Sequence, residues 1–393
     1  MNMELPKFPV NLALFNIKAH NPSFYELNAS LADAQRAANM AKGAGLRDFC
    51  VPVNPYFPTP QIQVEMMERM PESLKYYPPG NEAVAKVLGR TLALDPETLV
   101  LGNGSTELIT WIDRLFVKEN LITSVPTFGR WTDQPKETGK EVFYYRRCAA
   151  QDYAIDVDQF VAKVAETGSR VAVISNPNNP TGALTSVRDL KQLAERLSHL
   201  DLIVIDESFI EFSAVEEVPT FEHLAAKYPN VMVLKSLGKN FGQHGVRLGY
   251  CVANKSLAAD LRNALPKWNI NGVGVLLVEM YSKYHREYEL GRRAAVQDRI
   301  EFELALRQVT DLVVYPSSGN FVYVQAPFNV CGIALRNALL QDYGIFIREC
   351  GNKIGATSNH FRIAVRPKKD AEDLVVALRE TLRKLYVNVI DAH

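Results

Sequence analysis

One segment of the chain reads Leu234-Lys-Ser-Leu-Gly-Lys-Asn-Phe-Gly-Gln-His-Gly-Val-Arg-Leu-Gly-Tyr250. Apolar residues flank it on both sides, at 231–234 and at 250–253. Short apolar runs bounded by glycine predict two buried strands with this segment between them. We therefore expect Lys239 on a loop between two strands of one sheet, beside Gly238, where a ligand can approach the backbone closely.

Three side chains of this segment suit a single kind of ligand. A desolvated lysine close to another cation loses its proton readily, and its amine can then form a Schiff base with an aldehyde. Ser236 and Arg247 add a hydroxyl and a guanidinium fork, which are groups that bind phosphate. Lys239 for an aldehyde and two groups for a phosphate together indicate pyridoxal phosphate.

The spacing of Ser236 and Lys239 has two other interpretations. It opens the signature of penicillin-binding proteins and class A β-lactamases, but that signature also needs Ser-Asp-Asn and Lys-Thr-Gly, which this sequence lacks. A surface lysine without a role is the default for an isolated match. The pyridoxal phosphate interpretation therefore depends on support from the rest of the chain.

Length and composition describe an ordinary globular protein. The 393 residues suffice for one large domain and a smaller one, and 47% hydrophobic with 22% charged residues is a typical balance. Lys+Arg and Asp+Glu are both 44, so nothing indicates a nucleic-acid or membrane partner. The five cysteines are scattered without a C-x-x-C pair, which argues against disulfides and a zinc site. No signal peptide or apolar membrane-length run is recognisable, so we expect a cytoplasmic protein without a metal.

Prolines mark two segments before the middle of the chain. Val51-Pro-Val-Asn-Pro-Tyr-Phe-Pro-Thr-Pro60 contains four prolines and lacks backbone donors at them, which predicts an ordered loop that presents Asn54. The following residues, 60–70, predict a helix that ends before Pro71.

Apolar strands alternate with helices over the middle of the chain. Continuous apolar runs such as 202–205 predict parallel strands that are buried on both faces and covered by helices. Gly102-Asn-Gly-Ser-Thr-Glu107 lies between a strand and a helix, so it offers free backbone N–H groups and the positive helix end to an anion. It is no dinucleotide-binding motif, because Glu107 stands where the third glycine would fall.

Asp206 follows directly on the apolar run 202–205. A buried strand does not end in a carboxylate without a partner, because burying an unpaired charge is costly. A protonated pyridine nitrogen is one such partner, and a solvated loop is the alternative.

Five short motifs follow one another along the chain in an order typical of one enzyme family. They are Asn176-Pro-Asn-Asn-Pro-Thr-Gly182, Asp206-Glu-Ser-Phe209, Ser236-Leu-Gly-Lys239, Arg247-Leu-Gly-Tyr250 and Phe361-Arg-Ile363. With them the chain resembles the class I/II aminotransferases of fold type I, over about residues 54–366. The most similar subgroup includes histidinol-phosphate aminotransferase and threonine-phosphate decarboxylase.

The resemblance implies an α/β protein with the aspartate-aminotransferase-like fold and pyridoxal phosphate as its cofactor. A large domain with a mostly parallel sheet would take residues 50–270 and hold the cofactor. An N-terminal arm at 1–49 would join a small α/β domain, and residues 271–393 would supply a connecting helix and the rest of that domain.

The resemblance also assigns roles around the cofactor ring. Lys239 corresponds to the lysine that forms the Schiff base and moves a proton between the substrate's α-carbon and the cofactor. Asp206 corresponds to the carboxylate that keeps the pyridine nitrogen protonated, which makes the ring an electron sink. Asn179 would bond the phenolic oxygen, with the Asn179–Pro180 peptide expected in cis, and Phe128 would stack on the ring.

Further assignments concern the phosphate, the substrate and a second subunit. The phosphate would lie among donors from Ser236, Arg247, and the backbone of Ser105 and Thr106. Tyr77 corresponds to a tyrosine that reaches the phosphate from the neighbouring subunit, which implies a homodimer. Arg362 would grip the α-carboxylate of a small-molecule substrate bidentately, assisted by Asn54.

Arg366 lies four residues after Arg362, so along an extended strand both side chains point to the same face. Arg366 would then bind a second anionic group of the substrate, and the other interpretation is a solvated charge at a strand end. Phe209 stands where many aminotransferases carry a tyrosine. Together with Phe128 and Arg366 it is more similar to threonine-phosphate decarboxylase.

We expect from these features a pyridoxal-phosphate-dependent transamination of an amino acid, which would carry a second anionic group if Arg366 reaches the pocket. Two alternatives are α-decarboxylation of a phosphorylated amino acid and another specialised biosynthetic reaction on the same fold. A binding protein without turnover is a third, and the intact Lys239 and Asp206 count against it. Residue types do not fix which bond at the α-carbon stands perpendicular to the ring and breaks.

Overall fold

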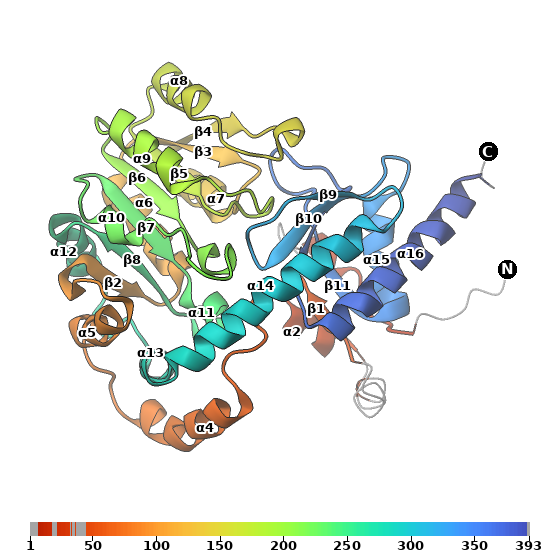
Figure 1. The fold of residues 1–393 in the computed structure, drawn as a ribbon, viewed down its shortest axis with the longest axis horizontal. Helices are drawn as coiled ribbons and strands as arrows, with labels where there is room; N and C mark the ends of the chain where they lie inside the picture. The colour runs from red at the N-terminus through yellow and green to blue at the C-terminus, as the bar shows by residue number, and fades with distance from the viewer. Residues whose placement is uncertain (1–6, 18–21, 32, 34–35, 37–44, 391–393) are drawn as a thin grey trace. The chain divides into compact units, whose positions relative to one another are not determined.

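The structure, a computed structural model, describes residues 7–17, 22–31, 33, 36 and 45–390 (Figure 1). The chain folds into two compact units. The larger comprises Val53–Val296 with Ser317–Asn320. The smaller comprises the described parts of Met1–Pro52 and Phe321–His393, together with Gln297–Pro316. Among the described residues, no helix is both long and apolar enough to cross a membrane.

The larger unit contains a seven-stranded sheet with the strand order β2-β8-β7-β6-β5-β3-β4. Its strands are β2 (Leu99–Gly102), β3 (Asn120–Val125), β4 (Glu141–Arg146), β5 (Val171–Ser175), β6 (Leu202–Asp206), β7 (Val231–Lys235) and β8 (Gly249–Ala253). All neighbours pair in parallel except β8, which runs antiparallel to β7 and to β2. The predicted mostly parallel sheet is therefore confirmed.

Helices cover both faces of this sheet. The helices of the larger unit are α4 (Pro60–Lys75), α5 (Asn81–Leu92), α6 (Ser105–Phe116), α7 (Arg130–Glu137), α8 (Val157–Thr167), α9 (Val187–Arg196), α10 (Glu222–Ala225), α11 (Leu237–Asn240), α12 (Lys255–Ala264), α13 (Gly272–Lys283) and the start of α14 (His285–Arg307). Within β6, Ile203 and Ile205 belong to one hydrophobic cluster, while Leu202 and Val204 belong to another. Because alternate residues of a strand face opposite sides, each face has its own core.

Two local predictions are wrong. The helix predicted to end before Pro71 continues through it as α4, to Lys75. A proline in a helix leaves the carbonyl four residues earlier without its donor. Here that residue is Met67, which is 61% exposed. Lys239 lies on the single helical turn α11, where the sequence predicts a loop.

The smaller unit contains a five-stranded sheet with the order β1-β11-β12-β10-β9. Its strands are β1 (Arg47–Phe49), β9 (Val313–Tyr315), β10 (Phe321–Gln325), β11 (Ile345–Glu349) and β12 (His360–Ala364), and its helices are α1 (Leu14–Ile17), α2 (Phe24–Ala29), α15 (Gly332–Tyr343), α16 (Lys368–Ile390) and the end of α14. β1, from the N-terminal arm, pairs in parallel with β11, and the other pairs are antiparallel.

Candidate active site

The parallel strands β5, β6 and β7 of the larger unit end side by side, and the predicted site residues lie at or just after these ends. The backbone N–H of Asn176, after β5, donates to the carbonyl of Asp206 at 2.8 Å. The N–H of Glu207, after β6, donates to the carbonyl of Leu234 at 2.8 Å, two residues before Ser236. Ligands bind preferentially outside the carboxyl ends of the strands in such sheets.

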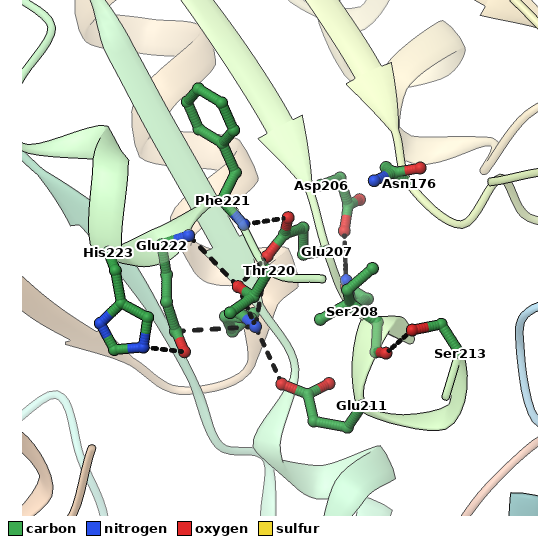
Figure 2. Close-up of polar contacts among 12 residues, drawn as sticks. Asn176, Asp206, Glu207, Ser208, Glu211, Ser213, Thr220, Phe221, Glu222 and His223 are labelled. Atoms are coloured by element: carbon green, nitrogen blue, oxygen red, sulfur yellow. Dashed lines mark hydrogen bonds and ion pairs between the residues drawn. The ribbon is translucent and has the colours of Figure 1, made fainter. Parts of the chain in front are cut away.

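Asp206 is a buried carboxylate held by three donors. It is 4% exposed, so the interpretation as a solvated loop residue is wrong. Trp131 Nε1–H donates to Oδ2 at 2.8 Å. The N–H and hydroxyl of Ser208 donate to Oδ1 at 3.1 and 2.6 Å, and Figure 2 shows Asp206 and Ser208 side by side. These donors are neutral, so the contacts orient the negative charge without cancelling it. Trp131, which holds the candidate site residue Asp206, is not predicted from the sequence.

Lys239 lies among aromatic rings. Its Nζ is 4.0 Å from the centroid of the Phe209 ring and 5.7 Å from that of the Phe128 ring. The carbonyl of Lys239 accepts a hydrogen bond from the N–H of Asn54 at 2.9 Å, which brings the proline-rich loop to the same turn. Gly242, with φ of +64°, allows this approach, because a side chain there would collide with the carbonyl of Asn54.

Arg247 lies against the first turn of α6. A Cβ on Gly104 would come within 2.6 Å of Nη2 of Arg247, so only glycine leaves room for the guanidinium there. Gly104 precedes Ser105 and Thr106, whose N–H groups lack acceptors within the helix and point outward at its positive end. Guanidinium and helix end together form a cradle for an anion.

The pKa of His244 is affected by the positive charges at this cradle. Its carbonyl and its Nε2 lie 3.3 and 3.4 Å from Nη1 of Arg247. Burial, together with the charges of Lys239 and Arg247, lowers the pKa of His244 to about 3. The imidazole is therefore neutral at physiological pH and adds no charge of its own to the cradle.

Asn179 is buried, whereas Tyr77 is exposed. Asn179 is 4% exposed in the turn after β5, and the predicted cis peptide Asn179–Pro180 is confirmed. The neighbouring Asn178 side chain donates to the carbonyl of Pro126 at 3.0 Å, which ties the turn to the segment that leads to Phe128. Tyr77 is 83% exposed, and its ring contacts Trp268 with a centroid separation of 5.0 Å.

Arg362 and Arg366 lie in the smaller unit and share a face. Nη2 of Arg362 donates to the carbonyl of Cys50 at 2.5 Å, and Nη2 of Arg366 donates to the next carbonyl, of Val51, at 2.9 Å. The Arg366 side chain is only 14% exposed, and burial lowers its pKa. The interpretation of Arg366 as a solvated strand-end charge is therefore wrong.

The residues of the larger unit fit pyridoxal phosphate. The cradle of Gly104, Ser105 and Arg247 suits its phosphate, and buried Asp206 suits a protonated ring nitrogen. Lys239 presents a primary amine between two aromatic rings. In addition, Nδ2 of Asn54 is buried without a hydrogen-bond partner among the described residues, as expected of a donor that awaits a ligand.

Comparisons with known proteins agree with this chemistry. L-serine phosphate decarboxylase of Sulfurospirillum multivorans is 31% identical over 348 residues, covering 86% of this chain and 88% of that protein. Histidinol-phosphate aminotransferase of Methanocaldococcus jannaschii is 25% identical over 332 residues, covering 84% and 87%. The solved histidinol-phosphate aminotransferase of Clostridium acetobutylicum superposes with a TM-score of 0.79 at 26% identity, covering 86% and 100%.

The match to a family model extends over most of the chain. The model for aminotransferase class I and II matches residues 48–380. This range includes β1 to β12 apart from the first residue of β1, and all the predicted site residues. The chain therefore belongs to the class I and II aminotransferases, an enzyme family that depends on pyridoxal phosphate.

Proposed function

We propose that this enzyme removes the α-carboxylate of a phosphorylated amino acid, and that serine phosphate is the first substrate to test. The observation that carries the proposal is the likeness to L-serine phosphate decarboxylase over most of both chains. Transamination, the first expectation from the sequence, becomes the second candidate. The likeness to histidinol-phosphate aminotransferases favours it, and the name of those enzymes also refers to a phosphorylated substrate.

Two residues of the larger unit would handle protons in this proposal. When bound, pyridoxal phosphate would supply an electron sink for the pair left by the broken bond at the α-carbon. Asp206 would hold a proton on the ring nitrogen, because a buried carboxylate with neutral partners stabilises an adjacent cation. The Lys239 amine would attach the cofactor, be released when the substrate amine takes its place, and then deliver a proton from Nζ, which lies beside the rings of Phe128 and Phe209.

Two guanidinium groups support a substrate with two anionic groups. Arg362 and Arg366 contact successive backbone carbonyls, so both present charge along one short segment. The nearest carboxylate oxygen to Arg366, on Asp48, is 3.9 Å away and leaves much of that charge uncompensated. Arginine binds carboxylate and phosphate oxygens through paired N–H groups. A serine phosphate molecule offers one of each.

The reaction is tested by product analysis of the holoenzyme with serine phosphate. Decarboxylation predicts carbon dioxide and phosphoethanolamine in equal amounts, without any oxo-acid acceptor. Transamination predicts at most one equivalent of oxo acid per active site until an acceptor such as 2-oxoglutarate is added, and then glutamate. Glutamate as the sole product, with no carbon dioxide, would replace the first candidate with the second.

Arg366→Ala should raise KM for the phosphorylated substrate by roughly ten- to a hundredfold, because one charged hydrogen bond contributes about 1.5–3 kcal/mol. The KM for unphosphorylated serine should change far less. Lys368→Ala is the matched control, since that neighbouring cation is 70% exposed. Equal effects of Arg366→Ala on both substrates would remove Arg366 from the phosphate site.

We also propose a homodimer in which Tyr77 serves the phosphate site of the partner. Tyr77 and Trp268 form an exposed aromatic pair, and α4 exposes Met67 and Leu74 in the same unit. Exposed apolar side chains in such numbers are typical of a surface that another protein covers. Sedimentation should give twice the mass of one chain, and a monomeric, fully active holoenzyme would contradict the proposal.

A further inference from the structure

A cluster of four charged side chains lies inside the larger unit, at the ends of β6 and β7. The Lys235 ammonium is 1% exposed, and Nζ lies 3.3 Å from Glu207, 2.9 Å from Glu211 and 3.6 Å from Glu222. The three glutamates come from separate segments: the residue after β6, the 3-10 turn at 210–212, and α10. Figure 2 shows their carboxyl groups converging from these segments.

Neutral donors also bind two of the three carboxyl groups, those of Glu207 and Glu222. The N–H of Phe221 donates to Glu207 at 2.8 Å, the hydroxyl of Thr220 donates to Glu207 at 2.5 Å, and the hydroxyl of Tyr250 donates to Glu222 at 2.7 Å. Burial raises the pKa of Glu207 to about 7. Burial also opposes the charge on Lys235, but the surrounding carboxylates raise its pKa overall, so the ammonium stays charged.

Such a cluster is a poor source of stability. The free energy needed to remove charged groups from water offsets much of the free energy gained from their attraction. Well-packed apolar side chains often stabilise a fold equally well. Charged hydrogen bonds are directional, however, and they fix the relative positions of the segments that supply them. The cluster is therefore better explained by the geometry that it imposes on the strand ends.

The same strand ends carry the cofactor residues. Glu207 directly follows Asp206, and Lys235 directly precedes Ser236. Neighbouring residues of an extended strand point to opposite faces. Asp206 and Glu207 are accordingly directed to different sides of the chain in Figure 2. The ion pair between Glu207 and Lys235 thus joins β6 to β7 behind the cofactor residues, one turn before Lys239.

We propose that Lys235 is a positioning residue, whose ion pairs with Glu207, Glu211 and Glu222 set the spacing between Asp206 and the Ser236–Lys239 turn and so the affinity for pyridoxal phosphate. The inference rests on the cofactor site alone. It holds whichever bond at the α-carbon the enzyme breaks, and substrate is not needed to test it.

The test compares Lys235→Met with Lys235→Arg by equilibrium dialysis of pyridoxal phosphate and by the absorbance of the bound cofactor against pH. Lys235→Met should raise the cofactor Kd by roughly tenfold or more. It should also shift the pH midpoint of the absorbance, because Asp206 and the Ser236–Lys239 turn would no longer be held at the spacing that fits the cofactor. Lys235→Arg should restore both values towards those of the unaltered protein.

Lys140→Met is the matched control. Lys140 is 11% exposed and lies 3.1 Å from the buried carboxylate of Asp113, so this variant also loses a buried ion pair in the larger unit. It should lower Tm but leave the cofactor Kd and the pH midpoint unchanged. A shift of both readouts in Lys140→Met equal to that in Lys235→Met would reduce the cluster to a general stabilising element.

Glu211→Gln keeps the proposal testable if Lys235→Met does not fold. Glu211 is the nearest carboxylate to Lys235, and its side chain is 16% exposed, so a neutral amide can be accommodated at this position. The variant should raise the cofactor Kd in the same direction, by a smaller factor. Normal cofactor affinity and an unshifted absorbance midpoint in Glu211→Gln would overturn the proposal.

Discussion

Replacing Lys239 with alanine is expected to abolish turnover while the protein stays folded and still binds pyridoxal phosphate. The variant loses both the amine that attaches the cofactor and the group that moves the proton, and proton transfer alone contributes about a hundred- to ten-thousandfold. The anion cradle at Gly104 and Arg247 is untouched, so the phosphate should still be held. The measurements are kcat and the cofactor content of the dialysed protein.

Borohydride provides the complementary measurement on the unaltered protein. It should fix the cofactor to one peptide, the one that contains Lys239, because reduction traps an amine–aldehyde adduct. Lys227→Ala is a control at an exposed lysine of the same unit and should leave trapping and turnover unchanged. Cofactor fixed to a different lysine, or turnover of Lys239→Ala close to normal, would show that the assignment is wrong.

The sheet could be predicted from the sequence because buried parallel strands are apolar on both faces. β6 and β7 read as continuous apolar runs, and their residues fill two cores at once. Local signals predicted the helix ends less well. Pro71 predicts the end of a helix, but α4 continues through it to Lys75, because a proline costs a helix one hydrogen bond without always ending it.

Contacts between distant residues mark the limit of prediction for the site. Trp131 lies 75 residues before its acceptor Asp206, and no spacing links the two. Its only local signal is its position three residues after Phe128, near the end of a strand. Lys235 belongs to the glycine-rich segment itself, yet its partners Glu211 and Thr220 come from a different loop. Motifs predict the groups that touch a cofactor better than those that position them.

Arg366 and the reaction type illustrate two further limits. The sequence left Arg366 open between a pocket and solvent, and the contact that buries it joins residues 315 positions apart. The bond that breaks is harder still to predict, because the roles proposed for Lys239 and Asp206 would serve decarboxylation and transamination alike. The orientation of the substrate decides between them, and relatives rather than motifs led us to favour decarboxylation.

Asp206→Ala should leave the fold intact and reduce kcat by more than a hundredfold with the true substrate. Loss of one charged hydrogen bond accounts for roughly ten- to a hundredfold, at about 1.5–3 kcal/mol, and the weakened electron sink adds to it. Trp131→Phe keeps the carboxylate but removes its donor at 2.8 Å, so a smaller loss of roughly tenfold is expected.

The relative sizes of the effects in these variants distinguish an electronic role of Asp206 from a structural one. Asp201→Ala, at the other end of β6, breaks an exposed ion pair with Arg170 and should retain normal kcat. If Asp206 acts on the ring nitrogen, the pH dependence of the cofactor absorbance should change strongly in Asp206→Ala, weakly in Trp131→Phe, and not at all in Asp201→Ala. Near-normal kcat in Asp206→Ala, or equal spectra for all three, would mean that the carboxylate does not hold the ring proton, and the electron sink would then have to be maintained by other groups.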